Sequence, residues 1–96
     1  MATELRYWHK SFVLDRYLLE LKIWLIGENL EYPEGYKYRL ICIDRKTGKK
    51  VLFDNHSPKG HHVHIDDREL PYRFATEQGL MDDFKKLIFE HLGVKL

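Results

Sequence analysis

The clearest signal of the fold lies in residues 36–55, YKYRLICIDRKTGKKVLFDN. Residues 36–44 alternate, as expected for a strand whose successive side chains point to opposite faces. One face would carry Tyr36, Tyr38, Leu40 and Cys42, and the other Lys37, Arg39, Ile41 and Ile43. Gly48 can take the positive φ of a hairpin loop, and KVLFDN (50–55) returns as the partner strand. An antiparallel hairpin is therefore predicted.

The preceding segment, SFVLDRYLLELKIWLIGE (11–28), fits two structures. Alternating apolar residues at 19, 21, 23 and 25 indicate a strand, whereas positions 14, 18, 21 and 25 also form a helical stripe. Residue propensities do not decide between them. The strand interpretation predicts a hairpin of residues 10–14 and 17–27 with its turn at 15–16. NLEYPEGY (29–36) contains Pro33 and Gly35 and reads as a loop.

The C-terminal segment predicts an amphipathic helix over residues 77–92. Thr76 can cap its first turn, and Gly93 suits the position after its last residue. One apolar stripe at helical spacing comprises Leu80, Phe84, Leu87, Ile88 and Leu92. The expected fold is α+β: an antiparallel meander of about four strands packed by this helix.

Length and composition restrict the classes of function. The 96 residues are expected to form a single domain, 1–96, and 16 Lys+Arg against 15 Asp+Glu give a net charge of +1. Overall charge therefore indicates no particular partner, and only local clusters can. Cys42 is the lone cysteine, which excludes an internal disulfide. With neither a signal peptide nor a long apolar run, we expect a cytoplasmic protein.

Histidines concentrate in DNHSPKGHHVHIDD, residues 54–67. If HHVHI is extended, His62 and His64 point to the same side with Cα atoms roughly 6.5–7 Å apart. Two imidazoles at this spacing could act as base and acid at a phosphate near neutral pH. They could equally hold a metal with Asp54, Asp66 or Asp67, or lie in a polar loop without chemistry. The pattern alone leaves all three open.

The order KVLFDN, GHHVHI, ELPYRF and LMDDF resembles the TumE family of toxin–antitoxin proteins. That family has a similar Asp-Asn pair, a Gly-Asp-His-x-His-Ile segment, Pro-Tyr-x-Phe and an Asp-Phe pair on a helix. The matching positions here are Asp54, Asn55, Gly60, His62, His64, Ile65, Pro71, Tyr72, Phe74, Asp83 and Phe84. His61 departs from the pattern, because the family often has Asp there. ELKIW (20–24) also resembles a family strand, which favours the strand interpretation of that segment.

The resemblance implies a small toxin that acts on RNA, with a helix-turn-helix antitoxin as its partner. We expect a metal-independent endoribonuclease, without a cofactor, in which His62 and His64 are the acid–base pair and Asp54 orients a histidine. Expected substrate-binding residues are Lys59 and Arg73 for the phosphate, Tyr72 for a base, and Asn55. No structural metal is expected, because such zinc sites close with four ligands, usually including cysteine.

Each of these residues also has a purely structural interpretation. The Asp54-Asn55 pair could simply end a strand, and Pro71-Tyr72 could pack the helix entry. Trp8 and Trp24 could belong to the core or the sheet surface, although an exposed tryptophan would indicate a partner face. The competing class of function is a non-catalytic binding module or metal-binding protein that uses the histidine cluster.

Overall fold

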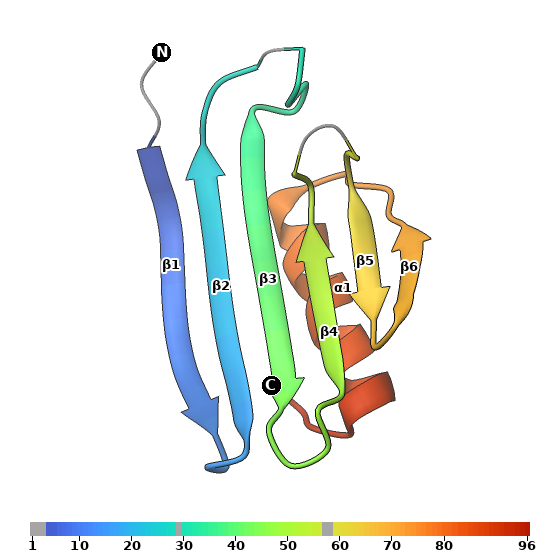
Figure 1. Cartoon of the computed structure of the whole chain (residues 1–96). Coiled ribbons are helices and arrows are strands. Elements are labelled where there is room, and N and C mark those ends of the chain that lie inside the picture. The colour runs from blue at the N-terminus through green and yellow to red at the C-terminus, as the bar shows by residue number, and fades with distance from the viewer. Residues whose placement is uncertain (1–3, 29, 57–58) are drawn as a thin grey trace.

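The computed structural model describes residues 4–28, 30–56 and 59–96, which form one antiparallel sheet and one helix (Figure 1). The sheet is a six-stranded meander in chain order, followed by α1. The strands are β1 (Glu4–Val13), β2 (Tyr17–Leu25), β3 (Tyr36–Asp44), β4 (Lys50–Asp54), β5 (His62–Ile65) and β6 (Arg68–Pro71). The α+β prediction is confirmed. The sheet is larger than the expected four strands, because the β5–β6 hairpin extends it.

The ambiguous N-terminal segment is the β1–β2 hairpin, which confirms the strand interpretation. Tyr17, Leu19, Leu21 and Ile23 are all buried on one face of β2, so the period of two matches burial. The first strand extends further than expected, starting at Glu4, and the turn occupies residues 14–16. Leu14 and Asp15 adopt positive φ values of 54° and 53° there. Arg16 then pairs with Asp44 at the end of β3, at 2.8 Å.

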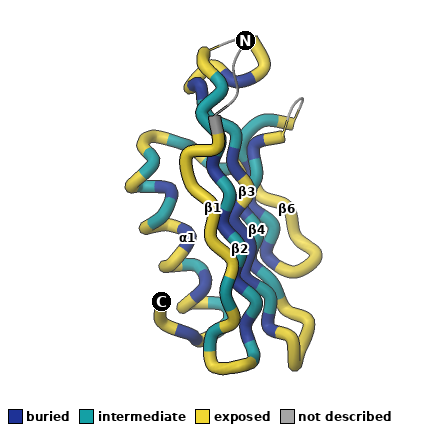
Figure 2. Tube along the Cα trace, turned by 90° about the vertical axis from the view of Figure 1, so that its left-hand side faces the viewer, coloured by how far each residue is buried: buried dark blue, intermediate teal, exposed yellow. Residues whose placement is uncertain are grey.

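Helix α1 (Glu77–Leu92) covers one face of the sheet, as Figure 2 shows from the side. The hydroxyl of Thr76 accepts a hydrogen bond from the Gly79 N–H at 2.9 Å, and Gly93 ends the helix with φ 75°. Its buried residues are Leu80, Phe84 and Ile88, which join the core formed by the inward side chains of the sheet. Both caps and both ends of the predicted helix are confirmed.

Within residues 4–28, 30–56 and 59–96, no helix covers the opposite face of the sheet, which we call the open face (Figures 1 and 2). Cross-strand register places alternate side chains of all six strands on it. No helix among the described residues has the length and apolar character needed to cross a membrane.

Candidate functional site

His62 and His64 lie side by side on the open face, as their spacing on β5 predicts. Their ring centroids are 4.8 Å apart and the rings are nearly perpendicular, at 85°. Val63, between them in sequence, points to the other face and is buried in the core. Burial of Val63 and Ile65 thus fixes which face receives the two imidazoles.

A hydrogen bond to the backbone sets the orientation of His62. Its Nδ1 lies 2.8 Å from the carbonyl oxygen of Gly60. A carbonyl oxygen only accepts, so Nδ1 carries the proton and donates it, which leaves Nε2 free for chemistry. Gly60 has φ 75°, a conformation that favours glycine. His62 is 7% exposed, and His64 is partly exposed.

The environment of His64 favours its neutral form. Burial is the main cause that lowers the pKa of His64 below its ordinary value, and the neighbouring His62 lowers it further. Glu69, on β6 directly opposite His64, acts in the other direction. A neutral imidazole accepts a proton, so His64 is suited to the role of a base.

Charged side chains surround the pair. Lys59 Nζ lies 3.2 Å from Glu69 Oε1, and this hydrogen bond is the main cause that lowers the pKa of Glu69. Asp54 on β4 is the cross-strand partner of His62, and Arg39 on β3 is the partner of Asp54. The structure therefore brings two of the expected residues, Lys59 and Asp54, beside the histidines. Sequence reasoning missed Glu69 and Arg39, because only strand register reveals their positions.

Three of the expected substrate-binding residues, Asn55, Tyr72 and Arg73, are not brought to the His62–His64 pair by the structure. Asn55 is 2% exposed and its amide bonds to β3, accepting from the Tyr38 N–H and donating to the Tyr36 carbonyl. Tyr72 packs edge-on against Phe53 in the core, so the structure does not bring it to the open face.

The hydroxyl of Tyr72 donates to Asp83 on α1 at 2.6 Å. Burial raises the pKa of Tyr72, and Asp83 raises it further. Arg73 is exposed just beyond β6 and, within the described part of the chain, makes no hydrogen bond or ion pair with either histidine.

His61, where the sequence departs from the family pattern, faces away from the pair. Its Nδ1 lies 2.7 Å from the Tyr38 hydroxyl, and its Nε2 lies 2.7 Å from Glu34 Oε1. The ring also stacks on Phe74, with centroids 5.2 Å apart. The residue that departs from the family pattern therefore contacts the β2–β3 loop and the helix side of the sheet rather than the His62–His64 pair.

A metal ion could be held by His62, His64 and Glu69, whose candidate ligand atoms all lie within 4.8 Å of one another. Two imidazoles and a carboxylate suit a transition metal in an open site. Among the residues that the structure describes, the site offers three candidate protein ligands, one fewer than a structural zinc site, and Lys59 already pairs with Glu69. Asp66, which the sequence also offered as a metal ligand, lies in the β5–β6 turn and accepts a hydrogen bond from the Lys50 N–H.

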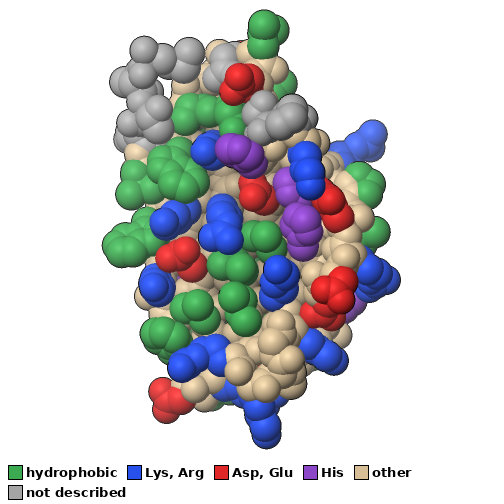
Figure 3. Space-filling model, in the orientation of Figure 1, with side chains coloured by type: hydrophobic (Ala, Val, Ile, Leu, Met, Phe, Trp, Pro, Cys, Tyr) green, Lys and Arg blue, Asp and Glu red, His purple; other side chains and the backbone are tan. Residues whose placement is uncertain are grey.

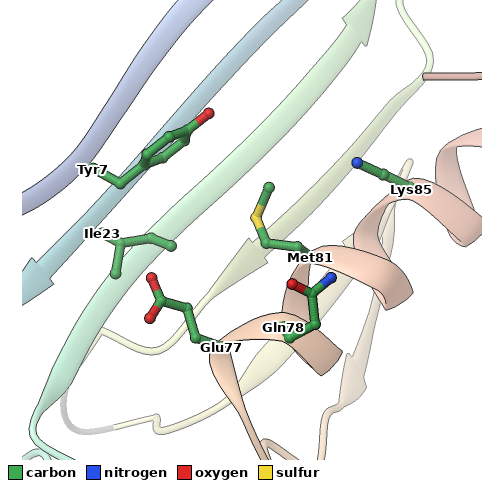
Figure 4. Close-up of a pocket in the computed structure, with 6 residues that line it drawn as sticks. All are labelled: Tyr7, Ile23, Glu77, Gln78, Met81 and Lys85. Carbon is green, nitrogen blue, oxygen red and sulfur yellow. The ribbon is translucent and has the colours of Figure 1, made fainter.

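A separate groove of about 380 Å³ lies on the helix side, between β1, β2 and α1 (Figure 4). It is lined by Tyr7, Ile23, Glu77, Gln78, Met81 and Lys85. Because the sheet separates it from the open face, this groove contributes nothing to the histidine site.

Comparison with known proteins gives one positive result. Searches of curated proteins and of solved structures found no match. Residues 4–92, nearly the whole chain, match the family described as Toxin TumE. The chain therefore belongs to the TumE toxin family, which makes it the toxin of a toxin–antitoxin module with an antitoxin as its partner.

Proposed function

We propose that this toxin is an endoribonuclease that cleaves RNA by acid–base catalysis with His64 and His62. The observation that carries the proposal is the pair of imidazoles 4.8 Å apart on the open face, with Lys59 nearby. Membership of a toxin family also supports the proposal, because cleavage of RNA would account for toxicity. Protonating both imidazoles at this distance is costly, because their positive charges repel each other. The pair therefore favours one protonated ring, the acid, and one neutral ring, the base.

In the proposed reaction, the ribose supplies the nucleophile. His64 takes the proton of a 2′-hydroxyl, whose oxygen attacks the adjacent phosphorus. The bond from phosphorus to the 5′-oxygen breaks, and protonated His62 gives that oxygen a proton from Nε2. The products are a 2′,3′-cyclic phosphate and a 5′-hydroxyl, so no water or cofactor is consumed.

The neighbouring charges have supporting roles in this proposal. Lys59 and Arg39 stabilise the negative charge that develops on the phosphate. Lys59 exchanges its contact with Glu69 for one with the phosphate, which leaves Glu69 free to stabilise a protonated imidazole. Asp54, opposite His62 on β4, helps to hold the positive charge of that histidine. The partner is proposed to be a helix-turn-helix antitoxin, and the site of action the cytoplasm.

Cleavage of purified RNA by the toxin, produced together with its antitoxin and then separated from it, tests the proposal. Wild-type protein should generate fragments with 2′,3′-cyclic phosphate ends, and His64→Ala should lower the rate by at least about 100-fold. His9→Ala is the matched control, because His9 is exposed on the other face, opposite Leu21. Equal cleavage by wild type and His64→Ala would refute the assignment.

A second arm separates the acid–base mechanism from a metal-dependent one. The acid–base reaction should continue unchanged in excess chelator. Loss of activity in chelator, restored by added zinc or manganese, would instead make His62, His64 and Glu69 metal ligands. Thermal melts of each variant ensure that lost activity does not reflect unfolding, which matters most for His62 because it is buried.

A further inference from the structure

Two tryptophans and three cations form a continuous band across the open face, from the edge of the sheet towards the histidines. We call this band the tryptophan–cation stripe. Cross-strand register pairs Trp8 with Lys22 and Lys22 with Arg39. The same row continues from Arg39 to Asp54 and from Asp54 to His62. Trp24 and Lys37, which also pair with each other, complete the stripe in the adjacent row.

The aromatic side chains of the stripe are available for stacking. Trp8 is 57% exposed, and Trp24 is partly exposed beside it on the neighbouring strand. Lys37 Nζ lies 5.6 Å from the centroid of the Trp24 ring, so a cation and a π face are already paired. In Figure 3, which looks onto the open face, hydrophobic groups at the left and basic groups beside them extend towards the histidines.

The charge of the stripe differs from that of the whole chain. Lys22, Lys37 and Arg39 contribute three positive charges within two rows, whereas the net charge of the protein is +1. The first acidic residue in the row of Trp8 is Asp54, next to His62. Exposed aromatic rings interleaved with cations suit a single-stranded nucleic acid, because bases stack and phosphates pair with the cations. An acidic protein surface would also pair with the cations, but it does not offer the alternating flat bases and phosphates that this arrangement matches.

We infer that the tryptophan–cation stripe binds single-stranded RNA and guides it to the His62–His64 pair. This inference deepens the proposed function and rests on RNA being the substrate. Four interstrand steps separate Trp8 on β1 from His62 on β5, a span of roughly 19 Å at about 4.8 Å per step. At a stacked rise of about 3.4 Å this accommodates roughly five nucleotides. Bases several nucleotides away from the scissile phosphate stack on the tryptophans, and the phosphates between them and the histidines contact Lys22, Lys37 and Arg39.

Intrinsic fluorescence can test the stripe directly, because both tryptophans of the chain belong to it. The probe is a mixed-sequence single-stranded RNA of 12 nucleotides, added to His64→Ala protein so that no cleavage interferes. Base stacking should quench the tryptophan emission, whereas polyglutamate, a polyanion without bases, should not. Trp8→Ala should weaken binding by about 5- to 150-fold, since that is the usual contribution of one stacked base.

The salt dependence of RNA affinity tests whether the three cations of the stripe contact phosphates. Changing Lys22, Lys37 and Arg39 to Gln together should lower the slope of log affinity against log salt by about two, at about 0.7 per phosphate contact. The matched control replaces Lys85, Lys86 and Lys95 with Gln; these exposed lysines lie on or just beyond α1. Tyr7→Ala is the aromatic control, because Tyr7 is 43% exposed on the same strand but lines the groove of the helix side.

The outcomes separate this inference from the proposed cleavage. Quenching and tight binding without cleavage by the wild type would support the stripe and refute the catalytic assignment. Cleavage by the wild type with no quenching, or with equal losses in the stripe and control variants, would overturn the stripe. Loss of antitoxin binding in Trp8→Ala, with RNA binding unchanged, would show that a protein occupies this surface and would also overturn it.

Discussion

Replacing Asn55 with alanine should destabilise the protein without removing a substrate contact. The Asn55 side chain is 2% exposed and continues the hydrogen bonding of β3 beyond the end of β4. Its Oδ1 accepts from the Tyr38 N–H at 2.9 Å, and its Nδ2 donates to the Tyr36 carbonyl at 2.8 Å. The alanine variant leaves both backbone groups without these partners.

The magnitude follows from the two lost bonds. A buried polar group left unpaired costs about 1–3 kcal/mol, so the two groups left by Asn55→Ala should lower the free energy of unfolding by about 2–6 kcal/mol. For a chain of this size, the melting temperature should fall by roughly 8 °C or more. Asn55→Asp keeps the acceptor but places a second oxygen against the Tyr36 carbonyl, so it should also be destabilising.

Urea unfolding followed by circular dichroism measures the change, with His56→Ala as the control from the same turn. The His56 side chain is exposed, so this control should unfold within about 0.5 kcal/mol of the wild type. Below the unfolding transition, folded Asn55→Ala should cleave RNA at the wild-type rate. A variant as stable as the wild type that no longer binds or cleaves RNA would refute this reasoning and restore Asn55 as a substrate-binding residue.

Two further predictions concern pH. Because burial and His62 lower the pKa of His64, its neutral form persists below pH 6.5, and the acidic limb of kcat/KM against pH should lie below that value. Glu69→Gln should shift this limb to still lower pH, since Glu69 raises the pKa of His64; an unchanged profile would count against His64 as the base. Arg16 holds the pKa of Asp44 well below its ordinary value of 3.8, so the ion pair stabilises the fold above about pH 4 and this contribution is lost as pH falls through the lowered pKa. Thermal melts should therefore show Asp44→Asn less stable than the wild type at pH 5–7, with the difference shrinking below pH 4; a constant difference would contradict this linkage.

Local patterns in the sequence were sufficient for the elements whose signals are short-range. The β3–β4 hairpin and the ends of α1 follow from alternation, a turn glycine and two capping residues, all of which act within a few positions. The shared face of His62 and His64 is also local, because an i, i+2 pair in a strand has the same parity. Residues 11–28 were different, because apolar residues at 21 and 25 satisfy both periods and only the family resemblance favoured a strand.

Tertiary structure alone decided which charged and aromatic groups reach the histidines. Glu69 lies opposite His64 only through the register of β5 and β6, and Arg39 reaches the same row through two further strand pairings. Tyr72 and Asn55 are close to the histidines in sequence. In the fold, however, Tyr72 packs on Phe53 and Asn55 hydrogen-bonds to β3, so both side chains make structural contacts. Sequence periodicity fixes the face of a strand on which a side chain lies, but the neighbours on that face come from pairing between distant segments, which no local pattern encodes.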